Sequence, residues 1–282
     1  MCISALLVVA SACGDSAASS ETTTAAAVTT IVLAKPVVSL PAATPTALKI
    51  TDLVTGTGPA AAVGDVVIVH YVGVRGADGQ EFDNSYDRGE PIDVLLGAGR
   101  VIPGWEQGLI GVQLGGRRQL DIPAALAYGA SPPAGGPIVA GDALTFVVDV
   151  VAVLPTPTAA DQPDITVAAG ANIAVLKSTD LIVGEGATPK DGQNVAVNII
   201  SYRADTGEML NTTWGSPPVK FSYSAQTEVF PGLLAAVKGM QVGGRRQAQV
   251  PFQLVFDGQG SADLGLPAGV DMVFVIDLVV IY

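Results

Sequence analysis

The chain is poor in the residues that build metal and redox centres. Its 282 residues include one histidine and two cysteines. Structural zinc sites need four cysteine or histidine ligands, so the sequence offers no plausible zinc or iron site. We therefore expect no cofactor. Aromatic residues are also few, at 5% of the chain, so any aromatic cluster would gather a large share of them in one place.

Positive charge is scarce as well. The chain has 14 Lys and Arg residues against 26 Asp and Glu residues, a formal net charge of −12. An acidic surface repels phosphate backbones, so no nucleic-acid partner is expected. The basic residues form no cluster beyond two Arg-Arg pairs, at 117–118 and 245–246. Each pair follows a Gly-Gly turn, and we interpret both pairs as solvated starts of strands.

Long helical patterns are missing, while β-branched runs recur between Gly and Pro residues. This pattern is typical of a sheet-rich fold. One short helix is predicted after Val101, with Pro103 where a missing N–H costs least. The strands that we predict in the first half are Asp65–Val74, a strand that begins at Glu81–Ser85, Pro91–Leu96, Gln119–Pro123 and Leu144–Leu154, and Lys49–Val54 with its polar turn leads into the first of them.

Alternation along Asp65–Val74 predicts which side chains share a face of the sheet. Val67, Val69 and Tyr71 fall on one face, and Ile68 and His70 fall on the other. His70 is therefore not expected to take part in chemistry on the Tyr71 side.

The chain contains one domain twice. Lys49–Leu154 aligns without gaps onto Lys177–Tyr282, at an offset of 128 residues and with 30 identical pairs. A register this long predicts two copies of one fold. We place the domains at residues 47–154 and 165–282, joined by a stiff linker rich in Pro, Thr and Ala at 155–164.

The N-terminal segment, residues 1–13, is apolar and ends in A-S-A-C. It resembles a bacterial lipobox, in which the cysteine receives a lipid. This predicts export and lipid attachment at Cys13, with the protein held on the outer face of a bacterial cytoplasmic membrane. The alternative is a plain cleaved signal and a secreted or periplasmic protein. Residues 14–46 are rich in Ser, Thr, Ala and Pro and predict a flexible tether.

Several short motifs occur in order across residues 47–154. They are H-Y at 70–71, F-D at 82–83, V-I-P-G-W at 101–105, G-G-R-R at 115–118, A-Y-G at 127–129 and L-T-F at 144–146. Together they resemble the FK506-binding-protein (FKBP) family of peptidyl-prolyl isomerases. The resemblance implies an α+β fold with two tandem FKBP-like domains. Each would be a curled antiparallel β-sheet wrapped across one short α-helix, with a shallow aromatic pocket between them.

The resemblance also implies a site in the first copy. Its candidate catalytic residues are Tyr71, Asp83 and Tyr128. Asp83, held by Tyr71, would lie near the twisting amide, and Tyr128 would offer its hydroxyl to the bound peptide. The candidate substrate-binding residues are Phe82, Ile92, Val101, Ile102, Trp105 and Phe146.

Within that set, Trp105 would form the floor and Ile102 would offer its backbone N–H to a peptide carbonyl. Ile92 stands where the family often has an aromatic residue, which bears on peptide preference. The implied partners are proline-containing polypeptide clients and FK506-like macrolides, with the membrane reached through the lipid. The alternative function is a non-enzymatic chaperone or scaffold module that binds unfolded or partner chains.

The second copy keeps the scaffold but changes the pocket. The positions of Tyr71, Phe82, Asp83, Trp105 and Tyr128 become Ile199, Leu210, Asn211, Leu233 and Phe256. Most of the replacements are apolar, so the core can survive, whereas the hydroxyls, the carboxylate and the indole floor are lost. We interpret this copy as folded but weakly active or inactive, and we expect aliphatic side chains to fill its hollow.

Overall fold

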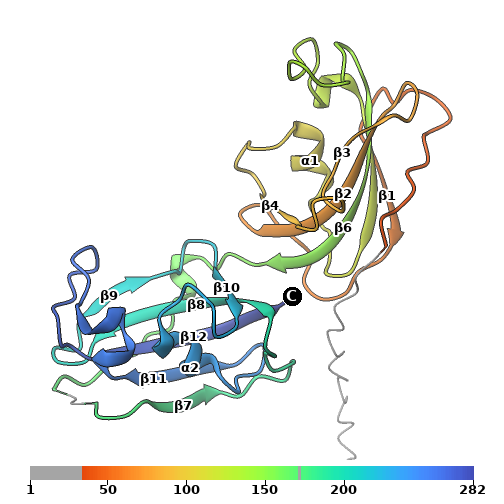
Figure 1. Ribbon diagram of the computed structural model, residues 1–282. Coiled ribbons are helices and arrows are strands. Elements are labelled where there is room, and N and C mark those ends of the chain that lie inside the picture. Colours follow the sequence, from red (N-terminus) through yellow and green to blue (C-terminus); the bar gives the residue numbers. More distant parts are fainter. Residues whose placement is uncertain (1–33, 171–172) are drawn as a thin grey trace, which may run out of the picture.

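The computed structural model describes residues 34–170 and 173–282, and Figure 1 shows two domains in sequence along the chain. The predicted signal segment, with Cys13, lies outside the described residues. Each domain is an antiparallel six-stranded sheet with one short α-helix. The predicted fold class is confirmed.

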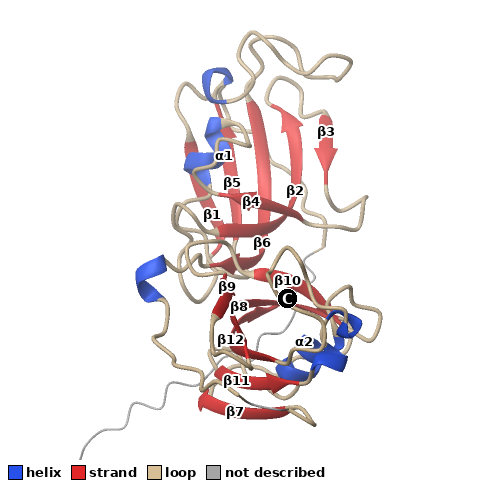
Figure 2. Ribbon diagram, turned by 90° about the vertical axis from the view of Figure 1, so that its left-hand side faces the viewer, coloured by secondary structure: helices blue, strands red, loops and turns tan. Residues whose placement is uncertain are grey.

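In the first domain the strand order is β1-β5-β6-β2-β3. The remaining strand, β4, pairs with the first half of β2, and β3 pairs with its second half. The helix α1, Pro103–Gly108, packs against β5 (Figure 2). The strands are β1 Lys49–Val54, β2 Val66–Arg75, β3 Glu81–Asn84, β4 Ile92–Leu95, β5 Arg117–Ile122 and β6 Leu144–Leu154.

The second domain repeats this order as β7-β11-β12-β8-β10, with β9 also paired to β8. Its helix α2, Pro231–Val237, packs against β11. The strands are β7 Lys177–Ile182, β8 Gln193–Arg203, β9 Met209–Thr212, β10 Val219–Tyr223, β11 Arg245–Val250 and β12 Met272–Ile281. Elements of the two copies begin and end within a residue or two of the same aligned positions.

The two faces of β2 differ as predicted. Val67, Val69 and Tyr71 belong to the main core beneath the helix, and Ile68 packs in a separate cluster on the other face. His70 also lies on that outer face, where its ring stacks on Tyr86. The inner face carries the cavity described below.

A buried arginine holds each helix to an edge strand. Arg118 donates from Nε to Asp52 of β1 at 2.6 Å and from Nη1 to the carbonyls of Gly108 and Ile110 at 2.8 Å each. These carbonyls sit at the end of α1, where intrahelical donors are lacking. The residue is only 7% exposed. The prediction of solvated strand starts is therefore wrong for this residue.

Arg246 repeats the arrangement in the second domain. It pairs with Asp180 of β7 at 2.6 Å and donates to the carbonyls of Ala236 and Lys238. It is 8% exposed, so the same correction applies. In both copies the Gly-Gly-Arg-Arg sequence joins the helix to the sheet.

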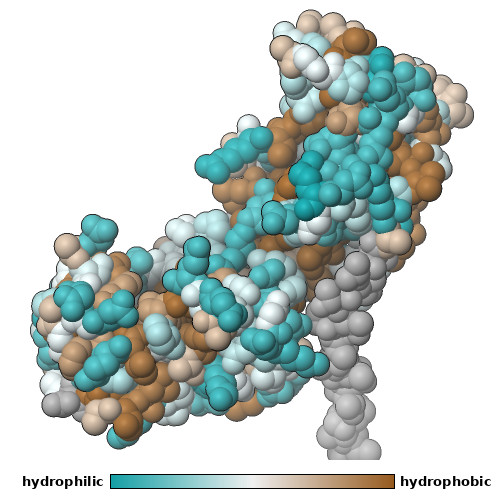
Figure 3. All heavy atoms as spheres, in the orientation of Figure 1, coloured by the Kyte–Doolittle hydropathy of each residue, from teal (hydrophilic) through white to brown (hydrophobic). Residues whose placement is uncertain are grey.

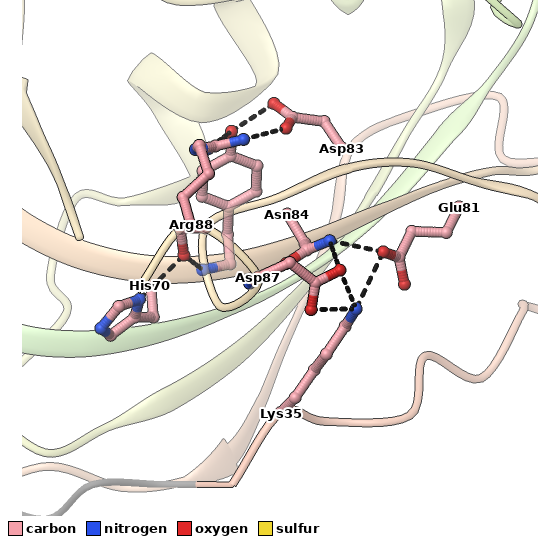
Figure 4. Close-up of polar contacts among 9 residues, drawn as sticks. Lys35, His70, Glu81, Asp83, Asn84, Asp87 and Arg88 are labelled. Carbon is pink, nitrogen blue, oxygen red and sulfur yellow. Dashed lines mark hydrogen bonds and ion pairs between the residues drawn. The ribbon is translucent and has the colours of Figure 1, made fainter. Parts of the chain in front are cut away.

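The chain before β1 lies along the outer face of the first sheet. Lys35 forms an ion pair with Glu81 at 3.0 Å, and Arg117 donates to the carbonyl of Ala34 at 3.0 Å. The last part of the predicted tether, residues 34–46, is therefore fastened to the first domain at its start. In Figure 4 Lys35 lies with Glu81, on the side of the strands away from Arg88.

The matching segment of the second copy covers its sheet with apolar contacts instead. Val167 and Ile173 pack with Tyr202 and Trp214 in one buried cluster. Trp214 is only 6% exposed. Its indole ring takes the aligned place of Tyr86, whose hydroxyl bonds to Asp149 in the first copy.

The domains touch through a small apolar cluster. Ile68 and Leu154 of the first domain pack with Ala196 and Val280 of the second. An ion pair between Asp93 of β4 and Lys220 of β10 lies beside it.

Candidate active site

One cavity of the first domain gathers every predicted pocket residue. Its volume is about 380 Å³. The predicted residues that line it are Tyr71, Phe82, Asp83, Ile92, Val101, Ile102, Trp105, Tyr128 and Phe146, and Gly99 and Arg100 complete the wall. The structure thus brings together residues from four strands, the helix and the loop after β5. Their roles in catalysis stay predictions.

Perpendicular aromatic rings form the inner part of the cavity. Trp105 is 4% exposed. Tyr71 meets it edge-on, with ring centroids 5.2 Å apart at 88°, and Phe146 does so at 5.2 Å and 86°. Phe82 packs edge-on against Phe146 at 5.6 Å. Such edge-to-face pairs are favourable, and they give the cavity an apolar inner wall.

Two glycines let the helix that carries Trp105 approach β5. A Cβ at Gly104 would lie 2.4 Å from Cγ2 of Ile122, and one at Gly108 would lie 2.7 Å from Cδ2 of Leu120. Any larger residue would push the helix off the sheet. The floor of the cavity therefore depends on residues that do not line it.

A third glycine makes room for the rings themselves. A Cβ at Gly73 would lie 2.6 Å from Cε1 of Phe146 and 2.8 Å from Cζ of Phe82. Sequence reasoning missed this residue. The repeat contained a signal for it: where the second copy has the larger Ser201 in place of Gly73, it also has the smaller Leu210 in place of Phe82.

Polar groups meet at one side of the rings. Tyr71 donates its hydroxyl hydrogen bond to Asp83. Arg88 donates from Nη1 to Asp83 at 2.5 Å and from Nη2 to the Tyr71 hydroxyl at 2.9 Å (Figure 4). Burial, and then the bond to Asp83, raise the pKa of Tyr71 to about 12, so this hydroxyl stays protonated at neutral pH.

Arg88 was not predicted as part of the site. It lies on the turn after β3, and no local pattern distinguishes it from a solvated arginine. Its guanidinium carbon lies 5.7 Å from the centroid of the Tyr71 ring. The carboxylate of Asp83 is thus held from two directions and is not free to rotate into the cavity.

Several donors at the cavity have no partner in the part of the chain that the structure describes, the buried Nε1 of Trp105 among them, and two of these donors are the ones predicted to bind the peptide. They are the backbone N–H of Ile102, which precedes the helix, and the hydroxyl of Tyr128. Tyr128 is 36% exposed and stands at the rim. Both are available to carbonyl oxygens of a bound chain.

The single histidine has no part in this cavity. Nδ1 of His70 lies 2.9 Å from the hydroxyl of Ser85, and burial lowers the pKa of His70. Residues 34–170 and 173–282 contain no group of three or more His, Cys, Asp or Glu side chains that could hold a metal ion.

The second domain also has a cavity at the aligned position. Its volume is about 520 Å³, larger than that of the first. Ile199 and Leu233 replace Tyr71 and Trp105, and their shorter side chains leave space that the neighbouring backbone does not close. The expectation that aliphatic side chains fill the second hollow is therefore wrong.

Comparison with known proteins now identifies the family. The profile described as FKBP-type peptidyl-prolyl cis-trans isomerase matches residues 58–151 and again 185–279. The chain belongs to this family. It carries two FKBP domains, and it is a peptidyl-prolyl cis-trans isomerase.

Two bacterial relatives of FKBP domains match over nearly their whole length. An FK506-binding protein of Streptomyces anulatus is 52% identical over 122 residues, which is 43% of this chain and 98% of the relative. A probable FK506-binding protein of Corynebacterium glutamicum is 42% identical over 120 residues, which is 42% of this chain and 98% of the relative.

A solved structure of the three FKBP domains of wheat FKBP73 covers a longer stretch. It is 19% identical, spans 83% of this chain and 94% of that chain, and superposes with a TM-score of 0.40.

Proposed function

We propose that the first domain catalyses rotation about X-Pro bonds of polypeptides in its aromatic cavity. The convergence of the nine predicted residues on one cavity, with Trp105 as its floor, carries this proposal. A proline ring would lie on the indole, between the edges of Tyr71 and Phe146. The Ile102 N–H and the Tyr128 hydroxyl would bind carbonyl oxygens and fix the chain on either side of the bond.

The chemistry needs no nucleophile. Amide resonance sets the rotation barrier at about 18–20 kcal/mol, and the twisted amide loses the charge separation of the planar form. A dry aromatic pocket therefore favours the transition state over the ground state. Lowering the barrier by roughly 6 kcal/mol would speed the reaction by about four orders of magnitude. The Asp83 carboxylate, held by Tyr71 and Arg88, would present a fixed charge beside the rotating bond.

The test exchanges residues between the copies of the full chain. Trp105→Leu with Asp83→Asn gives the first domain two residues of the second. We expect kcat/KM on a short X-Pro peptide to fall at least about 100-fold, or about 2.7 kcal/mol. Leu233→Ala in the second domain is the matched control and should leave kcat/KM unchanged. Full activity of the double variant would remove the first cavity from the reaction.

FK506-like macrolides are proposed to occupy the same cavity. The bacterial relatives bear the name FK506-binding protein, and the first cavity offers the apolar floor and free donors that such a ligand would use. We expect FK506 to inhibit the wild type and to bind the Trp105→Leu, Asp83→Asn variant much more weakly. Titration followed by Trp105 fluorescence, in a Trp214→Phe background, measures this for the wild-type cavity.

Export and lipid attachment are a further part of the proposal. Their support is the apolar run before Cys13 and the A-S-A-C-G sequence at 10–14. The described residues contain no helix of the length and hydrophobicity needed to cross a bilayer. In this setting the enzyme would assist the folding of exported chains. Intact mass of the protein in the membrane fraction, compared with Cys13→Ala, tests the lipid; an identical mass apart from the substitution would exclude it.

A further inference from the structure

The second cavity is open but lined differently. Its floor is aliphatic, from Ile199, Leu233 and Met272. At the entry to α2, Phe230 takes the aligned place of Ile102, stacks on Phe274 at 5.3 Å and 30°, and contacts Phe256 at 5.3 Å. The rings thus form one wall instead of a floor. A cavity of about 520 Å³ with such walls suits a long, flexible apolar side chain better than a flat proline ring.

The charged residues that line the two cavities differ: the first has one of each sign, Asp83 and Arg100, and the second has two carboxylates, Glu228 and Asp257. The first is lined by Arg100, which becomes Glu228 in the second, and both residues line their cavities. The carboxylate of Asp83 becomes the uncharged Asn211. Across the described ranges, no salt bridge involves Glu228. Glu228 is exposed, and a negative charge at the rim attracts a cation on the occupant.

A second carboxylate stands at the same cavity on a strained backbone. Asp257 aligns with Gly129, and both have left-handed φ values, +53° and +57°. Phe256 before it also has a positive φ of +45°. The second copy therefore keeps a conformation suited to glycine while placing a carboxylate beside the cavity, and strain of this kind gathers at functional sites. No salt bridge in the described part of the chain involves Asp257.

We propose that this cavity binds client polypeptides at a segment where a large apolar side chain stands next to a lysine or arginine, and that it does not isomerise them. Glu228 and Asp257 would pair with the basic side chain, while the aliphatic floor and Phe230 would hold the apolar one. The hydroxyl positions of Tyr71 and Tyr128 are Ile199 and Phe256 here, so the catalytic groups are missing.

The inference rests on the proposed function, because it takes the clients to be polypeptides. Binding at the second domain would keep a client near the first cavity and raise its effective concentration there. The formal charge of −12 on the whole chain favours encounters with basic segments. Long clients would thus gain more from the second domain than short peptides.

The test uses the full chain and fluorescein-labelled, proline-free peptides of roughly fifteen residues. One is glycine and serine around a leucine-arginine-phenylalanine-lysine segment, and its twin carries glutamate in place of arginine and lysine. We expect fluorescence anisotropy to show binding of the basic peptide and at least about tenfold weaker binding of the acidic twin. Equal binding of the two peptides would overturn the proposal.

The variants locate the site. Glu228→Arg with Asp257→Gly restores the residues of the first copy and should weaken binding of the basic peptide at least about tenfold. Glu185→Arg with Asp191→Gly makes the same charge change away from the cavity and should leave it unchanged, within about twofold. If the two variants weaken binding equally, the loss comes from the net charge of the chain, and the second cavity is excluded as the binding site.

Two further measurements separate the alternatives. Phenethylammonium carries the same apolar and cationic chemistry as a small molecule; displacement of the peptide by equimolar phenethylammonium would show that the site does not recognise a chain. Isomerase activity of Glu228→Arg, Asp257→Gly on a short X-Pro peptide should match the wild type. Absence of isomerase activity in the wild type and in the variant, while the wild type still binds the basic peptide, would refute the proposed function but leave this inference standing.

Discussion

The two domains place their strands at aligned residues, yet they enclose different cavities. The frame is common to both: Arg118 and Arg246 make the same bonds, and Gly104 and Gly232 allow the same approach of the helix. None of these four residues lines either of the two cavities compared above. This part of the frame is therefore separate from the residues that line the cavities, and one copy could change its cavity while keeping its shape.

The largest expected effect concerns the common frame. Arg118→Met and Arg246→Met each leave two helix-end carbonyls without their donor. We expect each to lower the free energy of unfolding of its own domain by about 3 kcal/mol. Urea unfolding read by Trp105 or Trp214 fluorescence, in backgrounds that lack the other tryptophan, measures each domain. Strongly unequal losses would mean that the two frames are not equivalent. Arg100→Met, at an exposed position, is the control.

The next effect concerns the ring packing that only the first copy has. Gly73→Ser introduces the second copy's residue against Phe146 and Phe82, and overpacking of this kind costs about 1–3 kcal/mol. Adding Phe82→Leu recreates the pair Ser201 and Leu210 and should recover part of the stability while activity stays low. Chemical denaturation measures the stability of each variant, and kcat/KM measures its activity. If Gly73→Ser alone were as stable and active as the wild type, the ring packing would not require glycine at this position.

The third prediction uses the hydroxyl that the second copy lacks. In the folded chain the pKa of Tyr71 is raised by burial to about 12, from about 10. The unfolded chain therefore loses this proton first, and stability should fall as pH rises from about 10 through about 12. Tyr71→Phe should flatten that part of the curve, because the other tyrosines are present in both proteins. Urea unfolding of both proteins between pH 9 and 11 measures this. If the free energy of unfolding fell equally with pH in the wild type and in Tyr71→Phe, the raised pKa of Tyr71 would be contradicted.

The smallest effect concerns the contact between the copies. Lys220 aligns with Ile92 of the first cavity but pairs with Asp93 across the domain boundary. Because the pair is exposed, Lys220→Ala should cost less than about 1 kcal/mol. It should not change kcat/KM on short peptides. A larger loss in thermal unfolding would show that the domains stabilise each other through this pair.

Much of the fold could be predicted from the sequence. Alternation and β-branched runs placed β6 at its observed bounds and β2 within one residue. These patterns are local, since each strand's faces are set by its own residues. The pocket set also came together, because the family motifs fall on strands whose order the fold fixes.

What escaped prediction depends on distant partners or on volume. Arg118 is buried because Asp52 lies 66 residues away and helix carbonyls face it. Arg88 joins the site only once the turn after β3 folds back over Tyr71. The size of the second cavity depends on whether the backbone moves inward where the smaller Leu233 takes the place of Trp105. Nothing in the sequence indicates that the backbone keeps its position.

The fastening of residue 35 has a mechanical consequence. Lys35 pairs with Glu81, Arg117 holds the carbonyl of Ala34, and Gln119 holds that of Ser39. The three residues that are held, at positions 34, 35 and 39, all precede β1 in the chain. A pull on the N-terminus would therefore act on these three contacts before it reached β1. Because the contacts join the segment to β3 and β5, the tension on a tethered molecule would be shared among several strands of the first sheet.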